Sequence, residues 1–136
     1  MNIGFIGASG LMGHGMAKNL LAKGHALALT VHRSRERVAD LLAAGAREAA
    51  SHAELARGSE IVFLCVTASP QVEQAFEGLI AGAHAGLTLV DCSTSEPEST
   101  ARLRERFGLF LPPWQDGVDA VVAELAAGWR LSRAST

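Results

Sequence analysis

The chain has 136 residues, of which 49% are hydrophobic, and this is enough for one domain with a core of its own. Its formal net charge of −2 gives no electrostatic reason to expect a nucleic acid or an anionic membrane surface as a partner. No apolar run approaches the roughly 18–20 residues that span a bilayer. No basic segment with a cleavage site begins the chain, so no secretory signal is visible and we expect a cytoplasmic protein.

Short apolar runs alternate with amphipathic segments along the chain. Strands are expected at residues 2–6, 26–31, 46–48, 60–66, 87–91 and 109–111. Helices are expected at residues 11–22, 35–44, 52–56, 70–79 and 97–107. Continuous apolar strands between amphipathic helices are typical of a parallel sheet covered on both faces. The sequence therefore predicts a doubly wound α/β domain over residues 1–111, and a tail, residues 112–136, with the apolar spacing of one helix.

A glycine-rich turn joins the first expected strand to the first expected helix. Its glycines are Gly7, Gly10 and Gly13, and the residues between them are Ala8, Ser9, Leu11 and Met12. In such a unit the first glycine permits the tight turn, the second lets the backbone approach a pyrophosphate, and the third lets the helix pack closely on the strand. The N–H groups and the positive dipole end of the helix favour an anion. The pattern predicts a dinucleotide site for NADP or NAD, although glycine turns also occur for structural reasons alone.

The residues at the end of the second expected strand are the ones that usually distinguish NADP from NAD. Sites that prefer NAD usually carry Asp or Glu here, which bonds the ribose hydroxyls of the adenosine half. This chain instead has His32, Arg33 and Ser34, with Arg35 and Arg37 close behind. An arginine fork matches the oxygens of a 2′-phosphate. The sequence therefore predicts NADP, with NAD as the alternative, and a basic surface loop without a ligand also stays open.

The next two strand ends carry the other candidate cofactor contacts. In an open parallel sheet the ligand lies at the carboxyl ends of the strands, near the point where the strand order reverses. We therefore expect Val66 and Thr67 to line the adenosine-ribose or the nicotinamide-ribose side of the site, and Gln71 to bond a ribose. Thr94 is expected to reach the nicotinamide end, whereas Asp91 is expected to be structural.

The two cysteines, Cys65 and Cys92, lie near the ends of two expected central strands. Two reduced thiols in a cytoplasmic protein are the simplest interpretation, and a regulatory disulfide is the alternative. No pair of histidines has the spacing of a metal site with Cys, Asp or Glu nearby, so no metal is predicted.

Five short motifs are more specific than the glycines alone. They are residues 3–7 (IGFIG), 11–20 (LMGHGMAKNL), 23–25 (KGH), 69–73 (SPQVE) and 91–97 (DCSTSEP). Together they resemble the start of the β-hydroxyacid dehydrogenases, the family of 3-hydroxyisobutyrate dehydrogenase and 6-phosphogluconate dehydrogenase, to which the imine reductases are related. The resemblance covers residues 1 to about 107. It implies a Rossmann domain with cofactor contacts at the residues named above, and hydride transfer between the nicotinamide and a small hydroxyacid or aldehyde acid.

The chain departs from the family pattern in two places. The family usually has one residue between its first two glycines, whereas this chain has Ala8 and Ser9, a spacing also found among short-chain dehydrogenase relatives. After the last expected strand the family continues with Asp-Ala-Pro-Val-Ser-Gly-Gly, which holds the substrate carboxylate, and with a helical domain that supplies a catalytic lysine. That motif is not found here, and the two lysines, Lys18 and Lys23, lie in or just after the first expected helix. We therefore predict no catalytic residue in this chain.

Two classes of function stay open at this point. The first is an oxidoreductase of the β-hydroxyacid dehydrogenase type whose substrate half is absent or supplied by another chain. The second is a module, or a truncated remnant, that binds the nucleotide without turnover. An imine reductase-like or short-chain dehydrogenase-like NADP domain is a further alternative. A small-molecule substrate is expected only if a substrate domain is supplied elsewhere, and an apolar surface left exposed for that domain predicts self-association.

Overall fold

A parallel sheet organises the part of the chain that the structure describes. The computed structural model describes residues 1–32, 34–108 and 123. The strands are β1 (Asn2–Ile6), β2 (Ala26–Thr30), β3 (Arg47–Glu48), β4 (Ile61–Leu64) and β5 (Thr88–Asp91). The helices are α1 (Leu11–Ala22), α2 (Ala39–Ala43), α3 (His52–Arg57), α4 (Ser69–Ile80) and α5 (Pro97–Phe107), and the 3₁₀ turn η1 (Glu36–Val38) precedes α2.

The chain divides into two compact units, Met1–Thr100 and Ala101–Thr136. The first unit holds the strands β1 to β5, the helices α1 to α4 and the first turn of α5. In the second unit, residues 101–107 complete α5. Within residues 1–32, 34–108 and 123, no helix is both long and apolar enough to cross a membrane.

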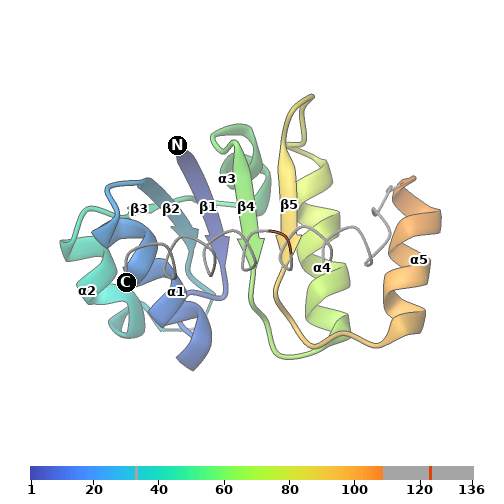
Figure 1. Ribbon diagram of the computed structural model, residues 1–136, viewed down its shortest axis with the longest axis horizontal. Coiled ribbons are helices and arrows are strands. Elements are labelled where there is room, and N and C mark those ends of the chain that lie inside the picture. The colour runs from blue at the N-terminus through green and yellow to red at the C-terminus, as the bar shows by residue number, and fades with distance from the viewer. Residues whose placement is uncertain (33, 109–122, 124–136) are drawn as a thin grey trace, which may run out of the picture. The chain divides into compact units, whose positions relative to one another are not determined.

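The strands lie in the order β3-β2-β1-β4-β5, and every pair is parallel (Figure 1). The chain moves outward from β1 to β3 and then crosses back to β4 and β5. Helices α1 and α2 cover one face of the sheet, and α3 and α4 cover the other (Figure 1). This confirms the predicted doubly wound α/β fold, with the reversal of strand order between β1 and β4.

Side chains of β1 alternate between two cores, as the period of a strand requires. Ile3 and Phe5 belong to a buried cluster on the α1 side. A Cβ on Gly4, which faces the other way, would lie only 2.9 Å from Leu55 Cγ in α3. The rings of Phe5 and Phe63 stack across β1 and β4 with centroids 6.1 Å apart. The remaining buried members of the α1-side cluster are Ala8, Ala17, Leu27, Leu29, Val38, Leu41 and Ala46.

The expected elements agree with the structure except near some of their ends. The helix expected at 35–44 is interrupted at Val38, whose φ of −122° and ψ of 8° lie outside the helical region, so that η1 precedes α2. The strand expected at 60–66 ends at Leu64, because the N–H of Val66 is bonded to the side chain of Ser93. The strand expected at 109–111, and all of the expected tail except residue 123, lie outside the described residues.

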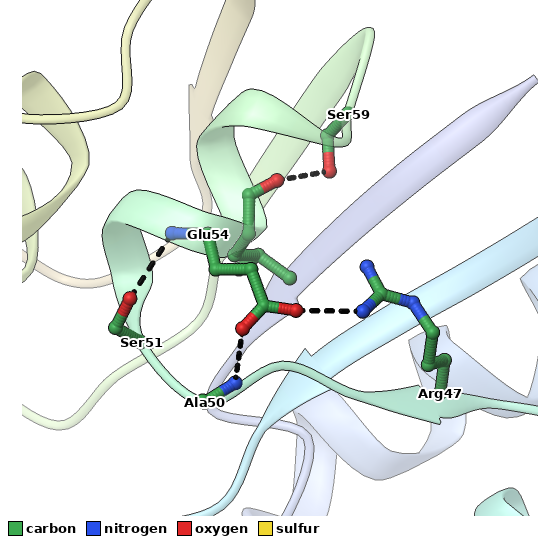
Figure 2. Close-up of polar contacts among 6 residues, drawn as sticks. Arg47, Ala50, Ser51, Glu54 and Ser59 are labelled. Carbon is green, nitrogen blue, oxygen red and sulfur yellow. Dashed lines mark hydrogen bonds and ion pairs between the residues drawn. The ribbon is translucent and has the colours of Figure 1, made fainter.

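The start of α3 is held by a network of side chains (Figure 2). Ser51 Oγ accepts a hydrogen bond of 3.1 Å from the Glu54 N–H, which is the cap expected of a serine at this position. The Glu54 carboxylate accepts hydrogen bonds from the Arg47 guanidinium at 2.7 Å and from the Ala50 N–H at 2.9 Å. These two bonds hold the pKa of Glu54 below its ordinary value, with the larger effect from Arg47. The network therefore ties α3 to β3.

Replacing Glu54 with glutamine is expected to lower the free energy of unfolding at neutral pH. Because the folded state lowers the pKa of Glu54 below 4.5, the carboxylate contributes stability above that pH and loses the contribution as the pH falls through the lowered value. Urea denaturation from about pH 7 to about pH 3 should show the gap between wild type and Glu54→Gln shrinking toward acid. Glu36→Gln, at an exposed glutamate of η1, is the control. A gap that is constant with pH would contradict the prediction.

Candidate functional site

The candidate residues gather at one edge of the sheet, where the strands end (Figure 1). Since all strands are parallel, the turns after β1, β2, β4 and β5 leave the sheet at this same edge. The described candidates at this edge are Gly7, Ala8, Ser9, Gly10, Leu11, Met12, Gly13, His32, Ser34, Val66, Thr67, Gln71 and Thr94. Arg33 lies outside the described residues.

The turn between β1 and α1 has no room for a side chain at two of its glycines. A Cβ on Gly7 would overlap the carbonyl oxygen of Cys65, and the φ of Gly7 is +94°, which L side chains rarely adopt. A Cβ on Gly13 would overlap the carbonyl oxygen of Gly7 and lie 3.2 Å from Phe5 Cε1. Gly10 is less crowded, with 3.3 Å from a Cβ to the Gly7 oxygen. Helix α1 therefore packs directly on the backbone of the turn.

Helix α1 begins at Leu11 without a side-chain cap. Gly10 donates its N–H to the Gly7 carbonyl at 3.0 Å, and its own carbonyl accepts a bond of 2.8 Å from His14. The first N–H groups of a helix have no partner inside the helix. Leu11 and Met12 are 97% and 71% exposed, so the helix start is open to solvent. An uncapped and open helix start has both the donors and the dipole to bind a phosphate group.

The turn after β2 carries the residues expected to distinguish NADP from NAD. His32 is exposed and Ser34 is half-buried. The guanidinium of Arg35 pairs with the carboxylate of Glu48 in β3 at 3.2 Å, which ties this turn to the neighbouring strand. Residues 31–35 contain no carboxylate that could bond a pair of ribose hydroxyls.

The turns after β4 and β5 are held to each other by serine side chains. Ser93 Oγ accepts a hydrogen bond of 2.9 Å from the Val66 N–H. Asp91 accepts one from the Ser93 N–H at 2.9 Å and another from the Ser95 hydroxyl at 3.3 Å, which is the structural role expected of this aspartate. The buried hydroxyl of Ser69 accepts a bond of 3.0 Å from the Glu96 N–H.

These serines leave the candidate contacts of the same turns facing outward. Thr67, Gln71 and Thr94 are exposed, and Val66 is half-buried. Sequence reasoning assigned no role to Ser69 or Ser93, although both lie inside the motifs that carry the family resemblance. Their occurrence in those motifs is the one feature of the sequence that could have pointed to them. The structure shows that their hydroxyl groups hold the turns after β4 and β5.

Comparison with known protein families agrees with this fold and this turn. Residues 2–108 match the model of the NAD binding domain of 6-phosphogluconate dehydrogenase. The chain belongs to this family. The resemblance predicted from the sequence is thereby confirmed.

Three similar proteins place the domain in longer chains. The 2-hydroxy-3-oxopropionate reductase of Escherichia coli (strain K12) is 38% identical over 106 residues, which are 75% of this chain and 35% of the reductase. The cytokine-like nuclear factor N-PAC of Xenopus tropicalis is 34% identical over 139 residues, covering 93% of this chain and 26% of that protein. The structure of the reductive aminase from Aspergillus terreus in complex with NADPH and ethyl levulinate is 25% identical with a TM-score of 0.63, and covers 76% of this chain and 35% of that one. The chain thus spans about a quarter to a third of the length of these proteins.

A histidine–aspartate pair adjoins the glycine turn, and no motif in the sequence indicates it. His14 Nε2 lies 2.9 Å from Asp40 Oδ1 and joins the beginning of α1 to α2. The hydrogen bond with His14 lowers the pKa of the Asp40 carboxyl below its usual range. In the described part of the chain, no group of three or more His, Cys, Asp or Glu side chains could hold a metal ion.

We expect opposite effects on stability from alanine at two glycines of α1. Gly13→Ala should lower the free energy of unfolding by about 1–3 kcal/mol, because the new Cβ overlaps the Gly7 carbonyl. Gly15→Ala should raise it by about 0.5–1 kcal/mol, because nothing lies within 4 Å of that Cβ and alanine favours the helix. Chemical denaturation of the two variants measures both changes. Equal effects would show that the turn is not closely packed.

Proposed function

We propose that this chain is an NADP-binding domain of the β-hydroxyacid dehydrogenase type. The observation that carries the proposal is the β1–α1 turn, where Gly7 and Gly13 have no space for side chains and α1 begins uncapped. Such a turn lets a pyrophosphate contact backbone N–H groups directly. The NADPH named in the structure of the similar Aspergillus terreus reductive aminase supports the same ligand class.

The preference for NADP rests on the turn after β2. Arg35 is already paired with Glu48, so we assign the 2′-phosphate to Arg33, with Ser34 as a second donor. His32 is exposed beside them and available to the adenosine half of the ligand. NAD is the weaker alternative, because residues 31–35 offer no carboxylate to the ribose hydroxyls.

In this proposal the chain orients a cofactor and does not react by itself. A bound nicotinamide would supply or accept the hydride, and the protein would supply position and electrostatics. Val66 and Thr67 would line the adenosine-ribose or the nicotinamide-ribose side, Gln71 would bond a ribose, and Thr94 would reach the nicotinamide end. A small hydroxyacid or aldehyde acid would bind only where a substrate domain is present, as the 2-hydroxy-3-oxopropionate reductase similarity suggests.

A nucleotide-binding module without turnover is the second candidate. The observation that favours it is the similarity to N-PAC, a protein named as a nuclear factor, over 93% of this chain. The absence of the family's substrate motif from these 136 residues favours it as well. An imine reductase-like domain is a third candidate, supported by the reductive aminase.

The proposal includes a cytoplasmic location and no nucleic-acid or membrane partner. The net charge of −2 supports the absence of a polyanionic partner. The two free cysteines support a reducing compartment. Self-association through exposed apolar surface is part of the proposal as well, and the exposed Ile80 at the end of α4 offers such surface away from the glycine turn.

Calorimetric titration with NADPH and NADH tests the ligand. NADPH should bind more tightly than NADH, and Arg33→Ala should weaken NADPH binding about tenfold or more while leaving NADH unchanged, because a charge-assisted bond to the 2′-phosphate is lost. Arg57→Ala, at an exposed arginine that ends α3, is the matched control and should change neither affinity. Equal affinities would contradict the NADP assignment, and binding of neither ligand would contradict the proposed function.

A turnover assay tests whether the chain only orients the cofactor or also catalyses the reaction by itself. The chain alone, mixed with NADPH and glyoxylate, succinic semialdehyde or tartronate semialdehyde, should oxidise NADPH no faster than the mixture without protein. The physical reason is that neither Lys18 nor Lys23 is placed at the carboxyl ends of β4 and β5, where the hydride would be exchanged. Absorbance of NADPH over time is the measurement. A robust rate would show that the chain carries catalytic groups of its own.

A further inference from the structure

Cys65 and Cys92 lie opposite each other at the edge of the sheet that carries the candidate site. The β4–β5 register pairs Leu64 with Asp91, and the two cysteines are the next residues on each side. The Cys92 N–H donates to the Leu64 carbonyl at 2.8 Å, which is the bond that a parallel ladder makes when Cys92 lies opposite Cys65. Opposed residues of a parallel pair point to the same face, so the two thiols are neighbours.

The geometry of this pair suits a disulfide. Adjacent strands lie about 4.7–4.9 Å apart, within the range of about 4.4–6.8 Å that disulfides span between Cα atoms. The ladder ends at this point, because the next N–H, that of Val66, is bonded to Ser93 Oγ. The strand ends are therefore not constrained by a further ladder bond, which leaves freedom for the Cβ atoms to approach.

The two thiols also differ in their exposure to solvent. Cys92 is exposed, whereas Cys65 is half-buried against the α1-side cluster. Because Cys92 is the more exposed of the two thiols, an oxidant reaches it first. Partial burial of its sulfur, the neighbouring Cys65 and the Asp91 carboxylate together raise the pKa of the Cys92 thiol. The raised pKa leaves less thiolate at neutral pH than an ordinary cysteine has, so the oxidation is slow there and speeds up as the pH rises.

We infer that Cys65 and Cys92 form an oxidisable dithiol that closes to a disulfide when it meets hydrogen peroxide. The Cys92 thiolate attacks one peroxide oxygen, the O–O bond breaks, and hydroxide leaves a sulfenic acid on Cys92. The Cys65 thiolate then attacks Cys92 Sγ, the S–O bond breaks, and a second hydroxide leaves. The two thiol protons convert both hydroxides to water, so two thiols are oxidised and one peroxide is reduced.

This disulfide would act on the nucleotide site through Gly7. The Cys65 carbonyl occupies the space where a Gly7 side chain would lie, so the backbone of Cys65 packs against the glycine turn. A disulfide that draws Cys65 toward Cys92 moves this backbone and with it the position of Gly7. Resting on the proposed function, we expect the oxidised chain to bind NADPH about tenfold more weakly than the reduced chain.

Intact mass and thiol counting after peroxide treatment, at about pH 8.5 to favour thiolate, test the disulfide. The wild-type chain should lose two hydrogens and both thiols without dimerising, and dithiothreitol should restore them. The matched control is the double variant Cys92→Ser, Thr88→Cys, which keeps two thiols on β4 and β5. Thr88 lies opposite Ile61, four residues from the Cys65 position, or roughly 13 Å along the strand, so no internal disulfide should form.

Independent oxidation of both wild-type thiols to sulfinic acids, with no disulfide, would overturn the inference. An NADPH affinity that is equal in the reduced and oxidised chains would overturn the coupling to Gly7. If the reduced chain binds no NADPH, the proposed function fails, while the mass result still decides whether the dithiol closes.

Discussion

The contact of backbone with backbone at the β1–α1 turn is the constraint on which the candidate site depends. A Cβ on Gly7 would overlap the carbonyl of Cys65, which follows β4, and a Cβ on Gly13 would overlap the Gly7 carbonyl, so the backbones of these segments pack directly on one another. No side chain separates these layers, and the start of α1 is thereby held at the edge of the sheet. The dipole and free N–H groups of α1 face this edge only because the packing fixes where the helix begins, and such a helix start favours an anion.

Several polar side chains around this edge bond to the protein itself. Asp91, Ser93 and Ser69 hold the turns after β4 and β5, and Arg35 is held by Glu48. A side chain engaged in this way fixes a turn and has less freedom to take part in proton transfer. The arrangement therefore holds the turns after β4 and β5 in fixed positions, as a surface that orients a ligand requires.

Most of the fold could be predicted from the sequence, because the signals that set the ends of helices and strands lie within a few neighbouring residues. The bounds of β1 and α1 follow from an apolar run, three glycines and a helix stop at Lys23-Gly24. Contacts between distant residues were not predictable in this way. The bond between Val66 and Ser93 shortens β4, and the pair of His14 and Asp40 joins two helices across 26 positions. Neither leaves a periodic pattern, since each depends on which elements the fold brings side by side.

Two relatives with very different names share this domain, a bacterial reductase and the nuclear factor N-PAC. A common fold does not fix a reaction, because function depends on the groups placed around the shared scaffold. Here the scaffold supplies the glycine turn that the family shares. Under the proposed function, binding and catalysis would be separate properties: residues 31–35 would set the nucleotide preference, and hydride transfer would depend on the groups placed around the bound nicotinamide.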